Sequence, residues 1–288
     1  MSSDQSTPPS GLLSSVRYYY YLPIAFFKIS RSAMGQRHHS LKDLIVMKFL
    51  LLTPWLYILG FKGRLSTPFG KVIITNREKM KSAAYGAFKT HFCYLKDMEA
   101  IDPRKTFFPV VVDVGANVGD FTLAVASSSG KVIAIEPGRE NFKSLVMNIA
   151  ENDVKNVIPV QAAAHSCREA LVLSGMDSML HVIGSGLGEI AQGVPLDQVL
   201  EELGTEHVDV LKLDVQGHEE KVLRGMAGTL ERKRIQLMVV EAHTSRGVRP
   251  YEIGNMMRSY GYRLVKTDKY IFGQPHMYFI ADGRDETG

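Results

Sequence analysis

Two acidic residues close apolar stretches near the middle of the chain. Asp113 follows a run of valines, Glu136 follows a second apolar run, and Gly115 and Gly119 come directly after the first acid. Strand, glycine turn, helix, strand and terminal acid form the mononucleotide-binding half of a doubly wound sheet, in which the second acid binds the two hydroxyls of a ribose. This part of the chain therefore predicts a site for an adenosine-containing ligand.

The acid before Gly115 helps to distinguish between the ligands that contain adenosine. A dinucleotide places its pyrophosphate at the N-terminus of the helix after the glycines, where the Asp113 carboxylate would repel it. The same carboxylate suits a cationic amino acid head group. S-adenosylmethionine carries an ammonium group, a ribose and no phosphate, so the loop favours a methyl donor over a nicotinamide dinucleotide.

Four blocks resemble the signatures of FkbM-type S-adenosylmethionine-dependent methyltransferases: Val112–Gly119, Ile135–Pro137, Leu211–Gly217 and Val240–His243. The resemblance extends over about residues 67–281. It implies the Rossmann-like, doubly wound seven-stranded α/β sheet of class I methyltransferases, ending in an antiparallel hairpin. It also implies S-adenosylmethionine as cofactor, and O-methylation of a hydroxyl on a sugar, a lipid-linked glycan or a secondary metabolite. The family usually has a glutamate where this chain has Gln216.

Alternating apolar runs and amphipathic stretches favour the same fold. The pattern predicts strands over 67–75, 110–114, 132–136, 157–162, 170–173, 208–214, 235–241, 262–265 and 277–281. Helices are expected over 80–100, 121–129, 141–152, 195–203, 218–226 and 250–260. The glycine-rich segment 184–193 has weak periodicity, and we interpret it as a loop near the mouth of the site.

Ligands of open α/β sheets lie beyond the carboxyl ends of the strands. The residues expected to bind the donor there are Asp113, Gly115, Asn117, Gly119, Phe121, Thr122, Glu136, Pro137, Ala162, Ala163 and Asp214. The two alanines are included by resemblance, because residues just beyond the third strand line the adenine in methyltransferases of this fold.

Methyl transfer to a hydroxyl needs alignment of the two reactants and a base that takes the proton. We expect His218 or His243 to be that base, with Asp214 or Glu241 orienting it. The start of a helix would lower the pKa of His218 and keep the imidazole neutral. A hydrogen-bonded structural role is the alternative reading of each histidine. No close-spaced metal motif occurs, so no metal is expected.

Two further classes of function stay open. One is a nicotinamide-dinucleotide-dependent oxidoreductase, which the acid before Gly115 disfavours. The other is a membrane-tethered binding module that has kept the fold and lost catalysis, which Gln216 favours. Methylation of a nucleic acid is not expected, because Asp214 is not followed by an aromatic block that would stack on a base.

The composition fits one catalytic domain with an appendage. The chain has 288 residues, of which 45% are hydrophobic, enough for a full core. We place an apolar, basic helical extension at 1–65 and the methyltransferase domain at 66–288. Cys93 and Cys167 lie far apart without metal-ligand spacing, which predicts reduced thiols and a cytoplasmic protein.

Positive charge concentrates in the first part of the chain. The residues up to Phe108 include 16 Lys or Arg and 6 acids, against 18 and 24 in the remainder. Two apolar, aromatic runs, 16–28 and 44–61, are flanked by cations, as interfacial helices are. One interpretation is that residues 12–61 contact the cytoplasmic face of a membrane peripherally. The other is that they pack on the catalytic domain or form an oligomer interface.

Overall fold

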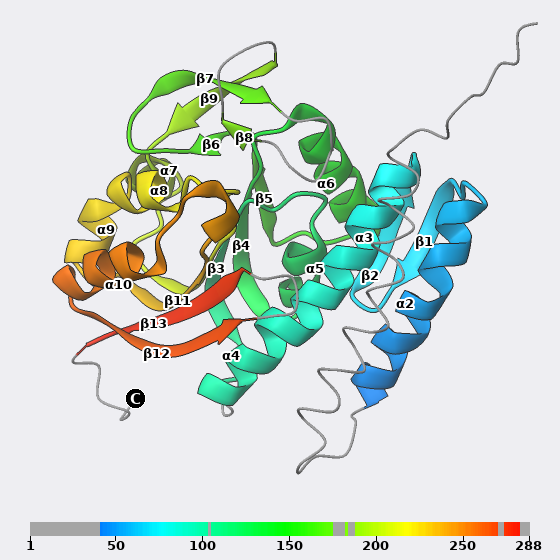
Figure 1. The fold of residues 1–288 in the computed structure, drawn as a ribbon, viewed down its shortest axis with the longest axis horizontal. Coiled ribbons are helices and arrows are strands. Elements are labelled where there is room, and N and C mark those ends of the chain that lie inside the picture. Colours follow the sequence, from blue (N-terminus) through cyan, green and yellow to red (C-terminus); the bar gives the residue numbers. More distant parts are fainter. Residues whose placement is uncertain (1–40, 103–104, 175–181, 184–187, 270–273, 283–288) are drawn as a thin grey trace, which may run out of the picture.

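The centre of the molecule is a seven-stranded sheet with the order β12-β13-β11-β10-β3-β4-β5 (Figure 1). The computed structural model describes residues 41–282 except 103–104, 175–181, 184–187 and 270–273. The strands of the sheet are β3 (Phe108–Val114), β4 (Ser129–Ile135), β5 (Val157–Val160), β10 (Val208–Leu213), β11 (Ile235–Glu241), β12 (Tyr262–Lys269) and β13 (Pro275–Ala281).

Five of these strands run parallel, and β13 lies antiparallel between β11 and β12. The parallel strands are apolar on both faces because helices cover both, and Val111, Val112 and Ile133 are fully buried. The last two strands form the expected hairpin. The doubly wound seven-stranded sheet predicted from the sequence is confirmed.

Helices cover the two faces of the sheet in two groups. One face packs against α7 (Leu196–Glu202), α8 (Glu219–Arg224), α9 (Ala227–Glu231) and α10 (Pro250–Ser259). The other packs against α4 (Lys96–Ile101), α5 (Asp120–Ala126), α6 (Arg139–Glu151) and the π-helical turn η1 (Thr90–Leu95). A short 3-10 turn, η2 (Thr244–Arg246), follows β11.

A second, four-stranded sheet lies beyond β5, with the order β6-β9-β7-β8. Its strands are β6 (Ala163–Ala164), β7 (Glu169–Ser174), β8 (Val182–Ile183) and β9 (Glu189–Val194). The expectation of a loop over 184–193 is therefore wrong for 189–193, which pair with β7. Gly193 allows the close pairing, because a Cβ there would lie 2.8 Å from Leu171 Cδ1. The remainder of that predicted loop, 184–187, lies outside the described residues.

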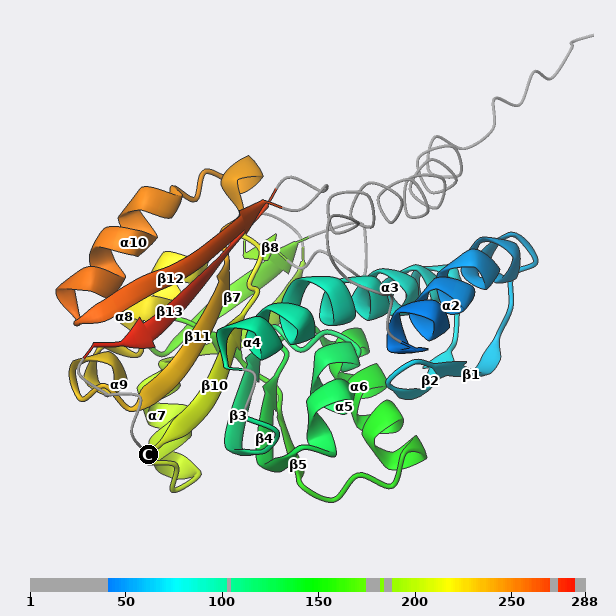
Figure 2. The same cartoon turned by 90° about the horizontal axis from the view of Figure 1, so that it is seen from below.

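The first described elements form a layer beside the sheet (Figure 2). They are α2 (Leu41–Ile58), the hairpin of β1 (Gly63–Thr67) and β2 (Gly70–Ile74), and α3 (Arg77–Lys89), which continues through η1 into α4. The inward face of α2 shares an apolar core with β2 and α3. The helix expected over 80–100 is thus present, and the second N-terminal apolar run packs on the catalytic part through one face.

Two asparagine side chains at the C-terminal end of α6 accept hydrogen bonds from β2 where a neighbouring strand would otherwise do so. Asn152 Oδ1 accepts a hydrogen bond from Lys71 N at 2.7 Å, and Asn148 Oδ1 accepts one from Ile73 N at 2.8 Å. These amide groups satisfy donors that an edge strand otherwise exposes.

Helix α2 continues through Pro54, which has no N–H to bond to the Leu50 carbonyl one turn earlier. Thr53 Oγ1 donates to that carbonyl instead, at 3.0 Å. In the part of the chain that the structure describes, no helix has the length and apolar character needed to cross a membrane. The other apolar run, 16–28, lies outside the described residues.

Candidate active site

The loop between β3 and α5 has a conformation that favours glycine. Gly115 has a φ of +82°, and a Cβ there would lie 1.9 Å from the carbonyl oxygen of Asp214. Asn117 also has a positive φ, of 52°, and its N–H donates to Glu136 Oε2 at 2.9 Å. The loop of β3 is therefore joined to the tips of both β4 and β10.

A small cavity of about 80 Å³ opens at the tip of β4. Glu136, Pro137, Ala162 and Ala163 line it together with Gly115, Asn117 and Asp214, as expected for the adenosine part of the donor. Burial raises the pKa of Glu136 to about 7, although the N–H groups of Gly138 and Asn117 act in the opposite direction. Its carboxylate is thus held in place by backbone amides.

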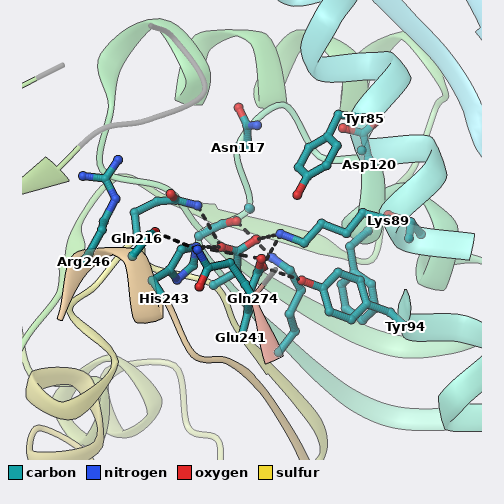
Figure 3. A pocket seen from close by; sticks show the side chains of 18 residues that line it. Tyr85, Lys89, Tyr94, Asn117, Asp120, Gln216, Glu241, His243, Arg246 and Gln274 are labelled. Carbon is teal, nitrogen blue, oxygen red and sulfur yellow. Dashed lines mark hydrogen bonds and ion pairs between the residues drawn. The ribbon is translucent and has the colours of Figure 1, made fainter. Parts of the chain in front are cut away.

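A larger cavity of about 280 Å³ lies beside the first and shares Gly115, Asn117, Asp214 and Gln216 with it. Phe121, Glu241 and His243 line it, all three predicted site residues. Helix α3 and the turn η1 supply the opposite wall (Figure 3). The two cavities are therefore adjacent and share part of their lining.

Three of the expected donor residues lie behind these cavities. Asp113 is completely buried; it accepts hydrogen bonds from Thr122 Oγ1 at 2.6 Å and from Lys212 Nζ at 2.7 Å. Neither Asp113 nor Thr122 lines a cavity, and Gly119 forms the N-terminal cap of α5. The direct contact expected between Asp113 and the donor's ammonium group is therefore not offered by this geometry, because Lys212 already neutralises the carboxylate.

An acid that the sequence interpretation overlooked faces the cavity instead. Asp120 lines the larger cavity, and no cation among the described residues lies within ion-pair distance of it. Burial, together with the charge of Asp113, raises the pKa of Asp120 to about 8. Its carboxyl group packs against Gly86, where a Cβ would lie 2.1 Å from Oδ2.

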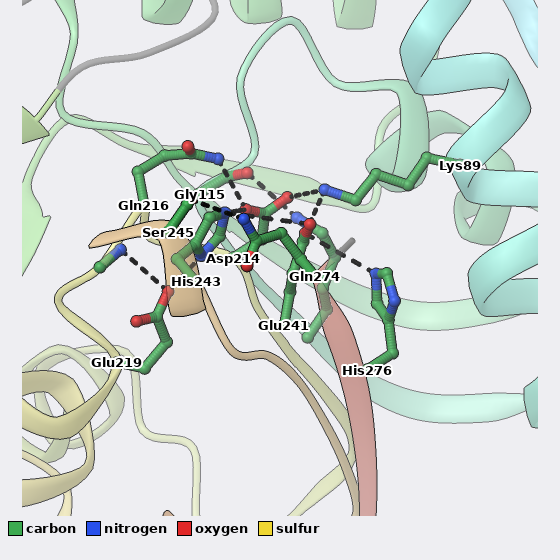
Figure 4. A network of polar contacts seen from close by, with 12 residues as sticks. Lys89, Gly115, Asp214, Gln216, Glu219, Glu241, His243, Ser245, Gln274 and His276 are labelled. Carbon is green, nitrogen blue, oxygen red and sulfur yellow. Dashed lines mark hydrogen bonds and ion pairs between the residues drawn. The ribbon is translucent and has the colours of Figure 1, made fainter. Parts of the chain in front are cut away.

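Lys89 brings a positive charge from α3 into the centre of the site. Its ammonium group lies 2.6 Å from Asp214 Oδ2 and also contacts Glu241 Oε2 (Figure 4). Burial would raise the pKa of Asp214, but the ammonium groups of Lys89 and Lys212 hold it well below its usual value. The pKa of Glu241 is raised by burial and by Asp214. Lys89 thus links α3 to the tips of β10 and β11.

His243 is held by a carboxylate other than the ones expected. Its Nδ1 lies 2.6 Å from Oε1 of Glu219, a fully buried residue in the first turn of α8. Its Nε2 points toward Asp214 Oδ1, at 3.6 Å. Burial acts to lower the pKa of His243, but Glu219, Asp214 and Glu241 outweigh it and raise the pKa. A histidine with one nitrogen fixed and the other at the cavity has the arrangement of a general base.

His218 lies on the other side of the site. It lines the small cavity and does not line the larger one. Its ring faces that of His165, with centroids 6.3 Å apart. The structure therefore separates the two candidate bases, and only His243 borders the space that an acceptor would fill.

One group of polar atoms at this site has metal-ligand chemistry. The carboxylates of Asp214 and Glu241 and the imidazole of His243 each offer an atom, all within 4.8 Å of one another. Lys89 already places a positive charge against both carboxylates. A divalent cation would have to enter beside that ammonium group and against its repulsion.

The side chains that sequence reasoning missed share one property. Tyr85, Lys89, Tyr94, Asp120, Glu219 and Gln274 border or support the site, yet none of them ends a strand. The only sequence signal available for Glu219 was its place two residues after Gly217, which puts it in the first turn of the helix after β10.

Comparison with known proteins identifies the family. Residues 113–264, more than half of the chain, match the model of the methyltransferase FkbM domain. The chain belongs to this family. Residues 113–264 therefore form an S-adenosylmethionine-dependent methyltransferase domain on the doubly wound sheet described above, and the oxidoreductase alternative loses its basis.

Two curated relatives of this FkbM-family chain have described activities. The hexuronic acid methyltransferase AglP of Haloferax volcanii is 26% identical over 151 residues, which are 51% of this chain and 61% of that protein. The 31-O-demethyl-FK506 methyltransferase FkbM of Streptomyces tacrolimicus is 25% identical over 236 residues, 69% of this chain and 88% of that protein. The chain thus spans about three fifths of the archaeal relative.

Part of the FkbM-family chain also aligns with a solved structure. An S-adenosylmethionine-dependent methyltransferase from Aquifex aeolicus aligns with a TM-score of 0.40 and 14% sequence identity, over 67% of this chain and 92% of that structure.

Proposed function

We propose that this protein transfers the methyl group of S-adenosylmethionine to a hydroxyl oxygen of a sugar or secondary metabolite, with His243 as the general base. The observation that carries the proposal is the fixed imidazole of His243 at the wall of the larger cavity, 2.6 Å from Glu219 on one side and facing the cavity on the other. The names of the two relatives support an oxygen acceptor.

The two cavities suggest how the donor is bound. Glu136 would bind the ribose hydroxyls, and Ala162 and Ala163 would leave a flat space for adenine. The methionine part would then cross the Gly115–Asn117 loop, which both cavities share. We assign the Asp120 carboxylate to the ammonium group of the donor. Asp113 would contribute only indirectly, by holding the Lys212 side chain in place.

The base would act on an acceptor hydroxyl in the larger cavity. S-adenosylmethionine supplies an activated methyl group on a sulfonium, so the protein's task is alignment and removal of one proton. His243 Nε2 accepts that proton, and Glu219 stabilises the resulting imidazolium from the other side. Asp214 and Glu241 place negative charge beside the ring, and Lys89 offsets part of it.

A glutamine at position 216 is compatible with catalysis in this arrangement. Its amide nitrogen donates to Asp214 Oδ1 at 3.1 Å. A glutamate at this position would add a further carboxylate beside Asp214 and Glu241. The amide instead satisfies the Asp214 oxygen that faces His243, so Gln216 by itself does not favour a non-catalytic binding module.

Two measurements in sequence test the proposal. Calorimetric titration with S-adenosylmethionine and S-adenosylhomocysteine should give micromolar binding that Glu136→Ala removes, whereas His243→Asn retains it. Methyl transfer to a panel of uronic acids, glycans and hydroxylated metabolites, followed with a labelled donor, should then fall roughly 10²–10⁴-fold in His243→Asn. Transfer to nitrogen acceptors alone, or an undiminished rate in His243→Asn, would contradict the assignment.

A further inference from the structure

Helix α2 presents to the outside of the molecule an apolar row that is interrupted by Lys48. The row consists of Leu41, Leu44, Ile45, Leu51, Leu52, Trp55 and, directly after the helix, Leu59, at the spacing of one helix face. Trp55 is 66% exposed and Leu59 79%. In the part of the chain that the structure describes, most of the exposed large apolar side chains lie on this row or beside it.

The opposite face of α2 is already covered by protein. Val46, Phe49, Leu50 and Tyr57 are buried in the core shared with α3 and β2. A helix that is apolar all round is normally covered on every side. The row therefore needs an apolar medium on the outside, at the edge of the molecule where Figures 1 and 2 place α2.

The exposed charges of α2 itself have one sign. Lys42 and Lys48 are exposed on the helix, Lys48 within the row, and the exposed Lys62 follows it. Arg64, the next cation, forms an ion pair with Glu151 at 3.0 Å. The only acid of the helix, Asp43, is buried and forms ion pairs with His91 and Lys96. An apolar row with tryptophan and exposed lysines, on a helix without an exposed acid, matches the interface of an anionic bilayer, in which a lysine side chain extends its ammonium group to the phosphates.

We propose that α2 lies in the surface of an anionic membrane, with the row buried among lipid head groups and acyl chains and the lysines at the phosphates. The helix has 18 residues, and no described helix is long and apolar enough to cross a membrane, so we place it in the surface of the bilayer. Because α2 packs on α3, the membrane contact belongs to the same layer of the molecule as Lys89 at the end of α3. The proposal concerns binding alone, and it holds whichever acceptor the enzyme methylates.

The chain contains its own reporter for this contact. Trp55 is the only tryptophan in the sequence, so intrinsic tryptophan fluorescence reads the environment of the row and of nothing else. The test mixes the full chain with vesicles of phosphatidylcholine and phosphatidylglycerol at 3:1, or of phosphatidylcholine alone, and records both flotation and the emission maximum.

We expect flotation with the anionic vesicles together with a blue shift of Trp55. The double variant Leu51→Glu, Leu52→Glu should bind at least tenfold more weakly. Ile190→Glu, which adds the same charge at an exposed apolar residue (72%) of the small sheet, should bind as the wild type does. Each of Lys42→Glu and Lys48→Glu should weaken binding by about fivefold or more.

Several outcomes would overturn the proposal. One is the absence of flotation by a folded protein. Another is flotation without a shift of Trp55, or flotation that the double variant leaves unchanged, since the contact would then lie elsewhere. A third is a dimer in sedimentation velocity that the double variant dissociates, because the row would then be covered by a second copy. Melting curves and donor titration of each variant report folding and the donor site separately.

Discussion

Glu219 sets the basicity of His243 through the hydrogen bond at Nδ1. The pKa of His243 lies above its ordinary value of 6.5, and only the unprotonated ring accepts a proton. The rate of methyl transfer should therefore rise with pH on the acid side, with a midpoint above 6.5. Removing the negative charge of Glu219 must lower that pKa.

Glu219→Gln tests this relation. The acid-side midpoint of kcat should move to lower pH, while kcat on the plateau falls because a more weakly basic, less firmly oriented ring accepts the proton. Glu220→Gln is the matched control, since Glu220 is the neighbouring glutamate and its partner is the exposed Arg224. The measurement is a pH profile of kcat; an unchanged midpoint would show that His243 does not limit the acid side.

Donor binding should change the protonation of Asp120. With a pKa of about 8, its carboxyl group is protonated near neutral pH in the free protein. A bound ammonium group favours the carboxylate and so lowers this pKa, and a proton is released. Calorimetry at pH 6.5 in two buffers of different ionisation enthalpy measures that release.

Asp120→Asn should abolish the proton release and weaken donor binding. Asp153→Asn, at an exposed aspartate near the surface Lys155, should change neither quantity. Release that persists in Asp120→Asn would assign the ammonium group to another acid of the site.

Helix α3 approaches α5 so closely that one position in it must be glycine. Alanine normally stabilises a helix interior relative to glycine, by roughly 0.5–1 kcal/mol. At Gly86 a Cβ would lie 2.1 Å from Asp120 Oδ2, whereas at Gly254 in α10 the nearest atom is 3.8 Å away. The two helical glycines therefore form a matched pair.

Gly86→Ala should lower the free energy of unfolding by about 1–3 kcal/mol and weaken donor binding, because α3 must move away from Asp120. Gly254→Ala should be neutral or stabilising. Urea denaturation measures both values. A stabilised Gly86→Ala would show that the Asp120 side chain turns aside without cost.

At the scale of the whole molecule, the donor links the two halves of the sheet, since its proposed site is built from β3, β4 and β10. S-adenosylhomocysteine at a hundredfold excess over Kd should stabilise the fold by about 2.7 kcal/mol. Differential scanning fluorimetry should show a corresponding rise of the melting temperature that Glu136→Ala abolishes. NAD at the same concentration should give no shift.

The sequence predicted those parts of the molecule that local pattern determines. The loop at Gly115 and the acid at Glu136 follow from short motifs, and their meeting follows from the rule that parallel strands end at one edge. Asp113 was assigned to the ligand because its spacing is right, but spacing does not reveal that Lys212, on the neighbouring strand, reaches it first. The position of Lys89 in the site depends on how α3 crosses the sheet, and no local sequence pattern specifies that crossing.

In the small sheet the sequence predicted β7, over 170–173, but missed β9 for a different reason. Its strands are short, and Gly188 and Gly193 weaken the alternation of apolar residues that predicts a strand. Pairing with β7, rather than intrinsic preference, gives β9 its extended conformation.

The two asparagines that complete β2 bear on the order in which the chain folds during synthesis. Lys71 and its partner Asn152 are 81 positions apart, and Ile73 and Asn148 are 75 apart. The hairpin emerges from the ribosome long before α6 does, so its outer amides stay with water until β3, β4 and α6 have been made. The N-terminal layer is thus translated first and completed late, and truncation before residue 148 should leave the outer amides of β2 without both asparagine partners.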